Sequence, residues 1–148
     1  MDMIIRPMEE QDVPAVTEIL IHEIASEAFR EQVAPFFKQV KNDENYQTFV
    51  ATLNQEVVGF VSTTTMLWPG RTKVNTTLFV QCIAVKREYQ HQGIGTKLLA
   101  HIEEYAKAKE ILGVGLQSGA SRTAAHACYE KNGYIRSNYY YKNFDIKK

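Results

Sequence analysis

The chain contains 148 residues, in which 17 lysines and arginines balance 17 aspartates and glutamates. Apolar residues make up 45% of the sequence and charged residues 23%, which is typical of a globular protein and excludes the collagen, coiled-coil and disordered classes. This length favours a single domain over residues 1–148. The zero net charge argues against nucleic acid or an anionic membrane as the main partner, because both attract a basic surplus.

The sequence has two cysteines, Cys82 and Cys128, without the spacing of a metal motif. A disulfide framework or a zinc site needs more ligands, so we expect reduced thiols and no metal. The N-terminus carries Asp2 ahead of a short apolar stretch, unlike a signal peptide, and no apolar run approaches the ~20 residues of a membrane span. We therefore expect a cytoplasmic protein.

The first quarter of the chain predicts one strand and two helices. The strand covers Met3–Pro7, and the first helix follows with Asp12 as its cap and Pro14 in its first turn. The apolar residues of this helix recur at helical spacing and should face the core; they are Val13, Val16, Leu20 and Ile24. The second helix is predicted over about Glu31–Lys41.

The middle of the chain predicts three strands, Tyr46–Leu53, Val57–Leu67 and Thr76–Val85, which are rich in β-branched and aromatic residues. Residues 54–56 are polar, and residues 68–71 include the proline and glycine of a turn. Because short turns join these strands, we expect them to pair as an antiparallel meander.

The second half alternates between helix and strand. We predict a helix over Gly93–Lys109, a strand over Leu112–Gln117, a helix over Arg122–Asn132 that ends at Gly133, and a strand region over Tyr134–Phe144. Crossover connections of this kind produce parallel neighbours, so the whole sheet should be mixed.

A glycine-containing turn, with Gly93 and Gly95, leads from the third predicted strand of the meander into an amphipathic helix. The N–H groups of a first helical turn converge and favour an anion, and glycines let a phosphate approach the backbone. A tight strand-to-helix turn explains the glycines equally well. The dinucleotide fingerprint fails at Leu98, and the P-loop pattern fails because Thr96 separates Gly95 from Lys97.

Two motifs in order resemble those of the GNAT superfamily of N-acetyltransferases. Residues 90–95, Q-H-Q-G-I-G, resemble its Q/R-x-x-G-x-G/A signature, and residues 125–134 resemble its A-x-x-x-Y-x-x-x-G-F/Y run. One helix and one strand separate them, as in the family. The opening residues 5–7 and Asp12 also resemble the family's first strand and helix cap.

The resemblance implies an α/β fold of the α+β type. Its mixed, mostly antiparallel sheet should have six to seven strands flanked by about four helices. The parallel neighbours would be the strands at 76–85 and 112–117, splayed to admit a cofactor. The implied reaction is direct transfer of an acetyl group from acetyl-CoA, as co-substrate, to a primary amine of a small molecule or peptide.

The family pattern also assigns roles to residues of this sequence. The backbone of residues 83–85 would pair with the pantetheine arm, and residues 90–96 would hold the pyrophosphate, with Gln90 shaping the loop. The implied cofactor-binding residues are therefore Ile83, Ala84, Val85, Gln90, His91, Gln92, Gly93, Ile94, Gly95 and Thr96. Tyr129 would protonate the departing thiolate. A backbone N–H near the end of the 78–85 strand would stabilise the oxyanion.

The base that removes the amine proton has several candidates. Gln81 lies two residues before Ile83 on the same side of a regular strand, and it could only orient a water. Glu23 and Glu27 lie four apart on the first predicted helix and either could serve, although a solvated helix face is the simpler explanation of both. His126 is a further candidate, or else a polar residue packed on its helix.

The family's usual asparagine before the motif tyrosine is replaced by Arg122. Arg122 or Ser121 could contact the cofactor instead. Two other functions stay open from the sequence: a CoA-binding module without transfer activity, and a partner-binding regulatory domain with an exposed apolar patch. A homodimer also stays open. Polyamines, aminoglycosides, amino acids and peptide N-termini all remain candidate acceptors.

Overall fold

The computed structural model describes residues 2–117, 123–137, 142 and 144. The chain divides into two compact units, residues 1–117 and residues 118–148. Ser121 and Arg122, two of the predicted cofactor-binding residues, lie outside the described residues.

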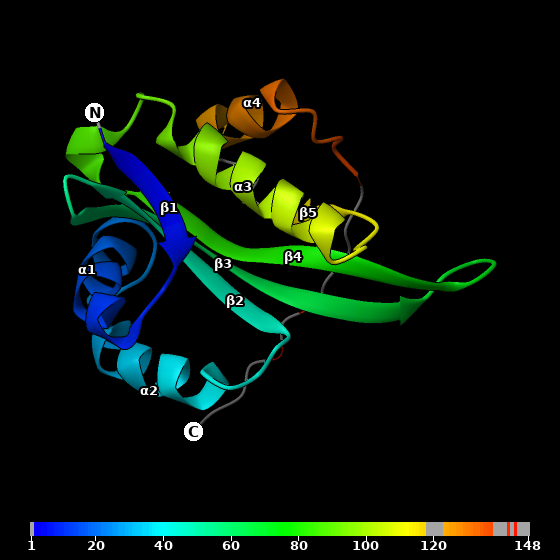
Figure 1. The fold of residues 1–148 in the computed structure, drawn as a ribbon, viewed down its shortest axis with the longest axis horizontal. Helices are drawn as coiled ribbons and strands as arrows, with labels where there is room; N and C mark the ends of the chain where they lie inside the picture. The colour runs from blue at the N-terminus through cyan, green and yellow to red at the C-terminus, as the bar shows by residue number, and fades with distance from the viewer. Residues whose placement is uncertain (1, 118–122, 138–141, 143, 145–148) are drawn as a thin grey trace. The chain divides into compact units, whose positions relative to one another are not determined.

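The first unit forms one sheet with helices on both faces (Figure 1). Its elements, in chain order, are β1 Met3–Pro7, α1 Val13–Glu23, α2 Arg30–Val40, β2 Tyr46–Leu53, β3 Glu56–Pro69, β4 Val74–Val85, α3 Ile94–Ala108 and β5 Val114–Leu116. The strands lie in the order β1-β2-β3-β4-β5, antiparallel except for the parallel pair β4–β5. The predicted meander and the predicted parallel pair are therefore confirmed.

The second unit contains helix α4, Thr123–Lys131. Gly133 follows it with φ of 89°, a left-handed conformation that ends the helix as predicted. The predicted strand over residues 134–144 is not confirmed: residues 134–137 are irregular, and most of the remainder lies outside the described residues. The sheet of the described residues is thus five-stranded, compared with the six to seven strands expected for the whole chain.

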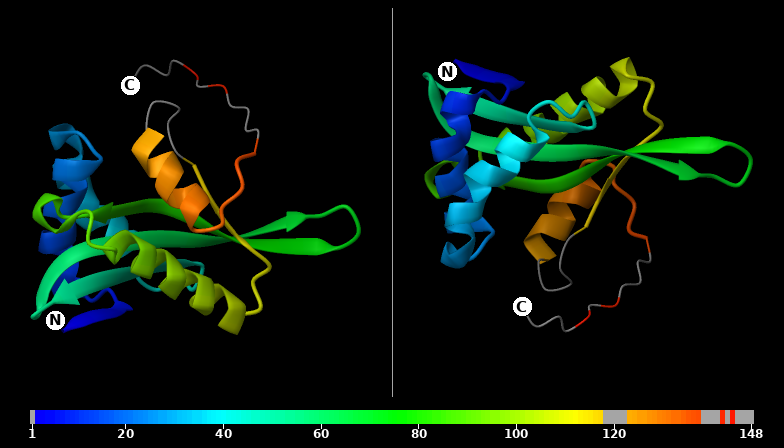
Figure 2. Two further views of the ribbon diagram at one scale, coloured as in Figure 1. Left: turned by 90° about the horizontal axis from the view of Figure 1, so that it is seen from above. Right: turned by 90° about the horizontal axis from the view of Figure 1, so that it is seen from below.

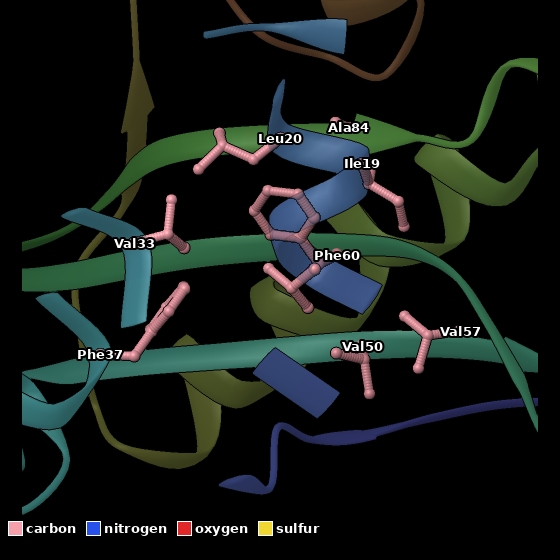
Figure 3. Close-up of a cluster of buried hydrophobic side chains, with 9 residues drawn as sticks. Ile19, Leu20, Val33, Phe37, Val50, Val57, Phe60 and Ala84 are labelled. Atoms are coloured by element: carbon pink, nitrogen blue, oxygen red, sulfur yellow. The ribbon is translucent and has the colours of Figure 1, made fainter. Parts of the chain in front are cut away.

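Alternating side chains of the strands build a core on each face of the sheet. Val50 and Phe60 pack with α1 and α2 in a buried cluster (Figure 3). Phe49, the neighbour of Val50 on β2, instead contacts the rings of His101 and Tyr105 on α3, with centroids 4.8 and 5.3 Å away. Because successive strand residues point to opposite faces, α3 covers the face opposite α1 and α2.

The two ends of α1 differ from the sequence prediction. Asp12 does not cap α1 with its side chain; it ends a 3-10 helix over Glu10–Asp12, and its carboxylate accepts the N–H of Glu9 at 2.8 Å. Ile24, expected in the core, is 43% exposed because α1 ends one residue earlier at Glu23.

Strands β3 and β4 continue past their neighbours as a two-stranded ribbon, which Figure 2 shows projecting from the sheet. Their pairing reaches Pro69 opposite Val74. The turn accordingly falls at residues 70–73, where the N–H of Gly70 donates to the carbonyl of Lys73 at 2.8 Å, and not at 68–71 as predicted. Cross-strand pairing has drawn the first two residues of the predicted turn into β3.

Candidate active site

The C-terminal half of β4 has an open edge. β4 pairs with β5 only over residues 78–80, whereas its pairing with β3 continues to Val85. Within the described residues, no strand pairs with the other edge of residues 81–85. Parallel pairing thus stops halfway along β4, at the place where the splayed cofactor site was expected.

Backbone hydrogen bonds decide which residues face this open edge. The N–H of Lys86 donates to the carbonyl of Val58 in β3 at 2.8 Å. Because successive residues in a strand direct their backbone groups to opposite edges, Ala84 also faces β3, while Ile83 and Val85 face the open edge. We expected all three residues at 83–85 to offer backbone groups to the cofactor, but this alternation turns Ala84 away.

A β-bulge at Gln81 sets the phase of that alternation. Ser62 and Thr63 are neighbours in β3, but their partners in β4 are Cys82 and Val80, so Gln81 is the extra residue. In a regular strand Gln81 and Ile83 would lie on the same side, as expected. The bulge shifts the alternation by one residue, so this expectation does not hold here. Gln81 itself is exposed.

The chain enters α3 through a compact loop. A 3-10 helix, Arg87–Tyr89, is followed by His91 and Gly93 in the left-handed conformation, with φ of 64° and 84°. The first hydrogen bond of α3 runs from the N–H of Lys97 to the carbonyl of Gly93, at 3.1 Å. The earliest N–H groups of the helix therefore point out of its N-terminal end.

Gly93 and Gly95 keep the space before this helix end open. Apart from its own chain neighbours and helix backbone, a Cβ atom at either position would meet no atom of the described residues within 4 Å. An anionic group can therefore come close to the backbone N–H groups, where the helix dipole is favourable. The geometry is what a pyrophosphate needs, and the assignment of residues 90–96 to that group remains a prediction.

The side chain of Gln90 connects the loop to two other elements. Its Nε2 donates to the carbonyl of Val85 at the end of β4, at 2.9 Å, and to Oε1 of Glu23 at the end of α1, at 2.8 Å. This position agrees with the predicted role of Gln90 in shaping the loop. The partnership with Glu23 was missed, because no local pattern connects residues so far apart in the sequence.

Glu27, predicted as a catalytic base, is not on α1 but in a 3-10 helix over Glu27–Phe29. Arg30 donates to both of its carboxylate oxygens, from Nε at 2.9 Å and from Nη2 at 3.1 Å. Arg30 also forms an ion pair with Glu18. The Glu27 carboxylate is thus exposed and already paired, and its role as a base remains a prediction.

The second unit carries the predicted proton donor, Tyr129, which is half-buried on α4. Its ring meets that of Tyr134 edge to face, with centroids 6.4 Å apart and an interplanar angle of 64°. His126, the alternative base, is half-buried on the same helix. Within its own unit, Tyr129 thus packs against Tyr134, and its role as proton donor remains a prediction.

Three further features of the described residues concern metal ligands, membrane-spanning helices and thiol reactivity. No group of three or more histidines, cysteines, aspartates or glutamates there could hold a metal ion. None of the described helices is long and apolar enough to cross a bilayer. Burial raises the pKa of the Cys82 thiol to about 11, which makes it a poor nucleophile at neutral pH.

Similarity to known proteins defines the family. Residues 14–134 match the acetyltransferase (GNAT) family. The ribosomal protein bS18-alanine N-acetyltransferase of Escherichia coli is 33% identical over 140 residues, which cover 92% of this chain and 86% of that protein. The chain therefore belongs to the GNAT acetyltransferase family, and it is an N-acetyltransferase.

Solved structures agree with this fold. A transcriptional regulator from Bacillus halodurans superposes with a TM-score of 0.88 at 21% identity, over 97% of this chain and 100% of that one. A predicted acetyltransferase from Clostridium acetobutylicum, solved with acetyl-CoA, superposes with a TM-score of 0.81 at 14% identity, over 97% and 96% of the two chains. At such identities the likeness shows the fold alone.

Proposed function

We propose that this enzyme takes its acetyl group from acetyl-CoA and transfers it directly to the N-terminal amine of a protein or peptide. The observation that supports the donor is the continuity between the open edge of β4 and the first turn of α3. A cofactor with an extended amide arm followed by a pyrophosphate fits this succession of backbone groups. When bound, acetyl-CoA supplies the acetyl group as an activated thioester.

The residues at the open edge would bind the arm as an added strand. Ile83 directs both its N–H and its C=O to that edge, whereas Val85 offers its N–H because Gln90 occupies its carbonyl. The N–H groups next to Gly93 and Gly95 would then hold the pyrophosphate without interference from a Cβ atom. Backbone recognition of this kind requires no excess of basic side chains, in keeping with a neutral chain.

Proton transfer falls to the remaining predicted residues. The phenol of Tyr129 is protonated at neutral pH, so its Oη can act as the proton donor. Gln81 accepts no proton but can orient a water, and the candidates for the base are the carboxylate of Glu27 and the imidazole of His126. Within this set, the only carboxylate is one that Arg30 already engages.

This modest provision for a base favours an acceptor that needs little deprotonation. An α-amino group has a pKa of about 7.7–8.0, so roughly a tenth of it is neutral at pH 7, against less than about a thousandth of a lysine side chain. The Escherichia coli relative is named for acetylating an alanine of ribosomal protein bS18. Both points support a protein N-terminus over a polyamine or a lysine side chain.

Two measurements test this proposal. Acetyl-CoA at ~100 Kd should stabilise the protein by about 2.7 kcal/mol, and no thermal shift at millimolar acetyl-CoA would exclude it as the donor. Release of free CoA thiol should then be seen with an alanine-initiated peptide, and not with the same peptide blocked at its N-terminus. If only an aminoglycoside or a polyamine is acetylated, the assignment of a protein N-terminus as the acceptor is wrong. If the protein binds acetyl-CoA but releases no CoA thiol with any amine, the result favours a CoA-binding module.

A further inference from the structure

Glu23, the last residue of α1, is a carboxylate held at the base of the loop that leads into α3. Its side chain is only 13% exposed. One oxygen, Oε1, accepts from Nε2 of Gln90 at 2.8 Å, and the other, Oε2, lies 3.6 Å from Nε of Arg87. A charge this well covered is costly unless it is paired, and here both partners come from the segment between β4 and α3.

The amide of Gln90 is fixed by its two acceptors. Nε2 carries two hydrogens, of which one goes to the carbonyl of Val85 and the other to Glu23. A reversed amide would set Oε1 against both acceptors, so the observed orientation follows from the chemistry of the partners. The backbone N–H of Gln90 is also bound, to the carbonyl of Arg87 at 3.2 Å.

We infer that Glu23 is a positioning residue for the donor site: it holds Gln90 against the end of β4 and thereby fixes the loop at residues 90–96. The choice of acetyl-CoA as ligand rests on the proposed function, whereas the positioning itself rests on these contacts. Without Glu23, the Gln90 amide loses one of the two acceptors that orient it. The backbone N–H groups of the loop then converge less often, and the ligand must pay that ordering cost on binding.

This assignment differs from a role of Glu23 as general base, which the sequence left open. A base must be free to take up a proton from the acceptor, whereas both oxygens of Glu23 already face donors of this chain. A neutral glutamine at position 23 keeps an oxygen that can accept from Gln90, but it cannot act as a base. The two roles therefore separate in the Glu23→Gln variant.

Three variants of the full-length protein test the inference. Glu23→Ala should raise the Kd and KM for acetyl-CoA about tenfold, the loss of one charge-assisted hydrogen bond, while kcat changes less than about twofold. Glu23→Gln should restore most of the affinity and keep kcat and its pH profile. Glu18→Ala removes an exposed carboxylate from the same helix, paired with Arg30 and not with Gln90, and should keep the wild-type Kd for acetyl-CoA.

Hydrogen exchange of the ligand-free protein gives a readout that needs no cofactor. The amides of Gln90 and Lys97, whose N–H groups are bonded to the carbonyls of Arg87 and Gly93, should exchange faster in Glu23→Ala than in the wild type, Glu23→Gln or Glu18→Ala. Unchanged exchange in Glu23→Ala would overturn the inference, as would a loss of kcat in Glu23→Gln of about 10²-fold, the signature of a base. If the wild type itself fails to bind acetyl-CoA, the proposed function fails, while exchange still decides the role of Glu23.

Discussion

The guanidinium of Arg6 on β1 forms a bidentate pair with the carboxylate of Asp12. Nη1 donates to Oδ2 at 2.7 Å, and Nη2 donates to Oδ1 at 3.0 Å. The Asp12 side chain is 5% exposed and that of Arg6 32%. Since Asp12 also accepts the N–H of Glu9, the pair joins the first strand to the chain that enters α1. Asp12, which the sequence predicts to be a helix cap, therefore connects β1 to the segment that enters α1.

The Arg6–Asp12 pair predicts a particular loss of stability in acid. The hydrogen bonds that Asp12 accepts from the Arg6 guanidinium hold the pKa of Asp12 below its usual value of 3.8. The pair therefore stabilises the fold fully above about pH 4, and its contribution falls as the pH drops through the lowered pKa. Asp12→Asn should cost about 1–3 kcal/mol in urea unfolding at pH 7, and the difference from the wild type should shrink below pH ~4.

Glu10→Gln is the control for this prediction. Its ion pair with Lys41 is exposed, with side chains 84% and 59% accessible, so the change should stay within about 0.5 kcal/mol. A gap between wild type and Asp12→Asn that stays constant down to pH 2 would contradict the role of Asp12 ionisation.

The β2–β3 turn should accept a stabilising glycine. Asn54 and Gln55 have φ of 49° and 72°, the left-handed pair of a two-residue hairpin, and glycine suits the second position best. Gln55→Gly should therefore raise the unfolding free energy by about 0.5–1 kcal/mol, measured by thermal melting. The matched change Gln39→Gly lies in α2, where glycine should lower stability by about the same amount, and equal shifts in both variants would count against the turn.

Gly95 should show opposite effects on stability and on binding. It lies in the first turn of α3, and a Cβ atom there would contact none of the described residues outside its own helix, so Gly95→Ala should raise the melting temperature slightly through the better helix propensity of alanine. The same methyl group would stand where the pyrophosphate is proposed, and the Kd for acetyl-CoA should rise about tenfold or more. Gly113→Ala, where a Cβ likewise contacts none of the described residues outside its own chain neighbours, should leave the Kd for acetyl-CoA unchanged. A wild-type Kd in Gly95→Ala would show that the pyrophosphate does not bind at this helix end.

Tyr129→Phe should lower kcat for acetyl transfer by about 10²-fold, at the low end of general acid catalysis, with little change in the Kd for acetyl-CoA. Tyr134→Phe removes the hydroxyl of its edge-to-face neighbour and serves as the control. Single-turnover kinetics keep slow product release from hiding the chemical step. Unchanged single-turnover rates in Tyr129→Phe would remove this residue from the reaction.

Local patterns in the sequence predicted most of the secondary structure. Period-two and helical spacing located the strands and helices of residues 3–116 to within a few residues, because each pattern reflects which side chains must be buried. Errors occur where a cross-strand partner overrides local preference. Trp68 and Pro69 have turn character, yet pairing with Asn75 and Val74 holds them in β3.

The sequence predicted the motifs of the candidate site, but it did not predict how β4 aligns with β3. The glycines at 93 and 95 and the placement of Gln90 follow from the sequence signature, because left-handed backbone and close approach demand those residue types. Which backbone groups of β4 face outward depends instead on the bulge at Gln81, a matter of how β3 and β4 align. No single strand specifies its alignment with another.

The sequence by itself thus determined a neutral α/β chain with the two motifs of an acetyltransferase, because periodicity and glycine placement are local properties of the chain. Only the tertiary structure decided the partners of its charges: Asp12 with Arg6, and Glu23 with Gln90 across 67 positions of sequence. The physical reason is that a carboxylate taken out of water binds the donors that folding brings to it, and distance along the chain does not predict which donors those are.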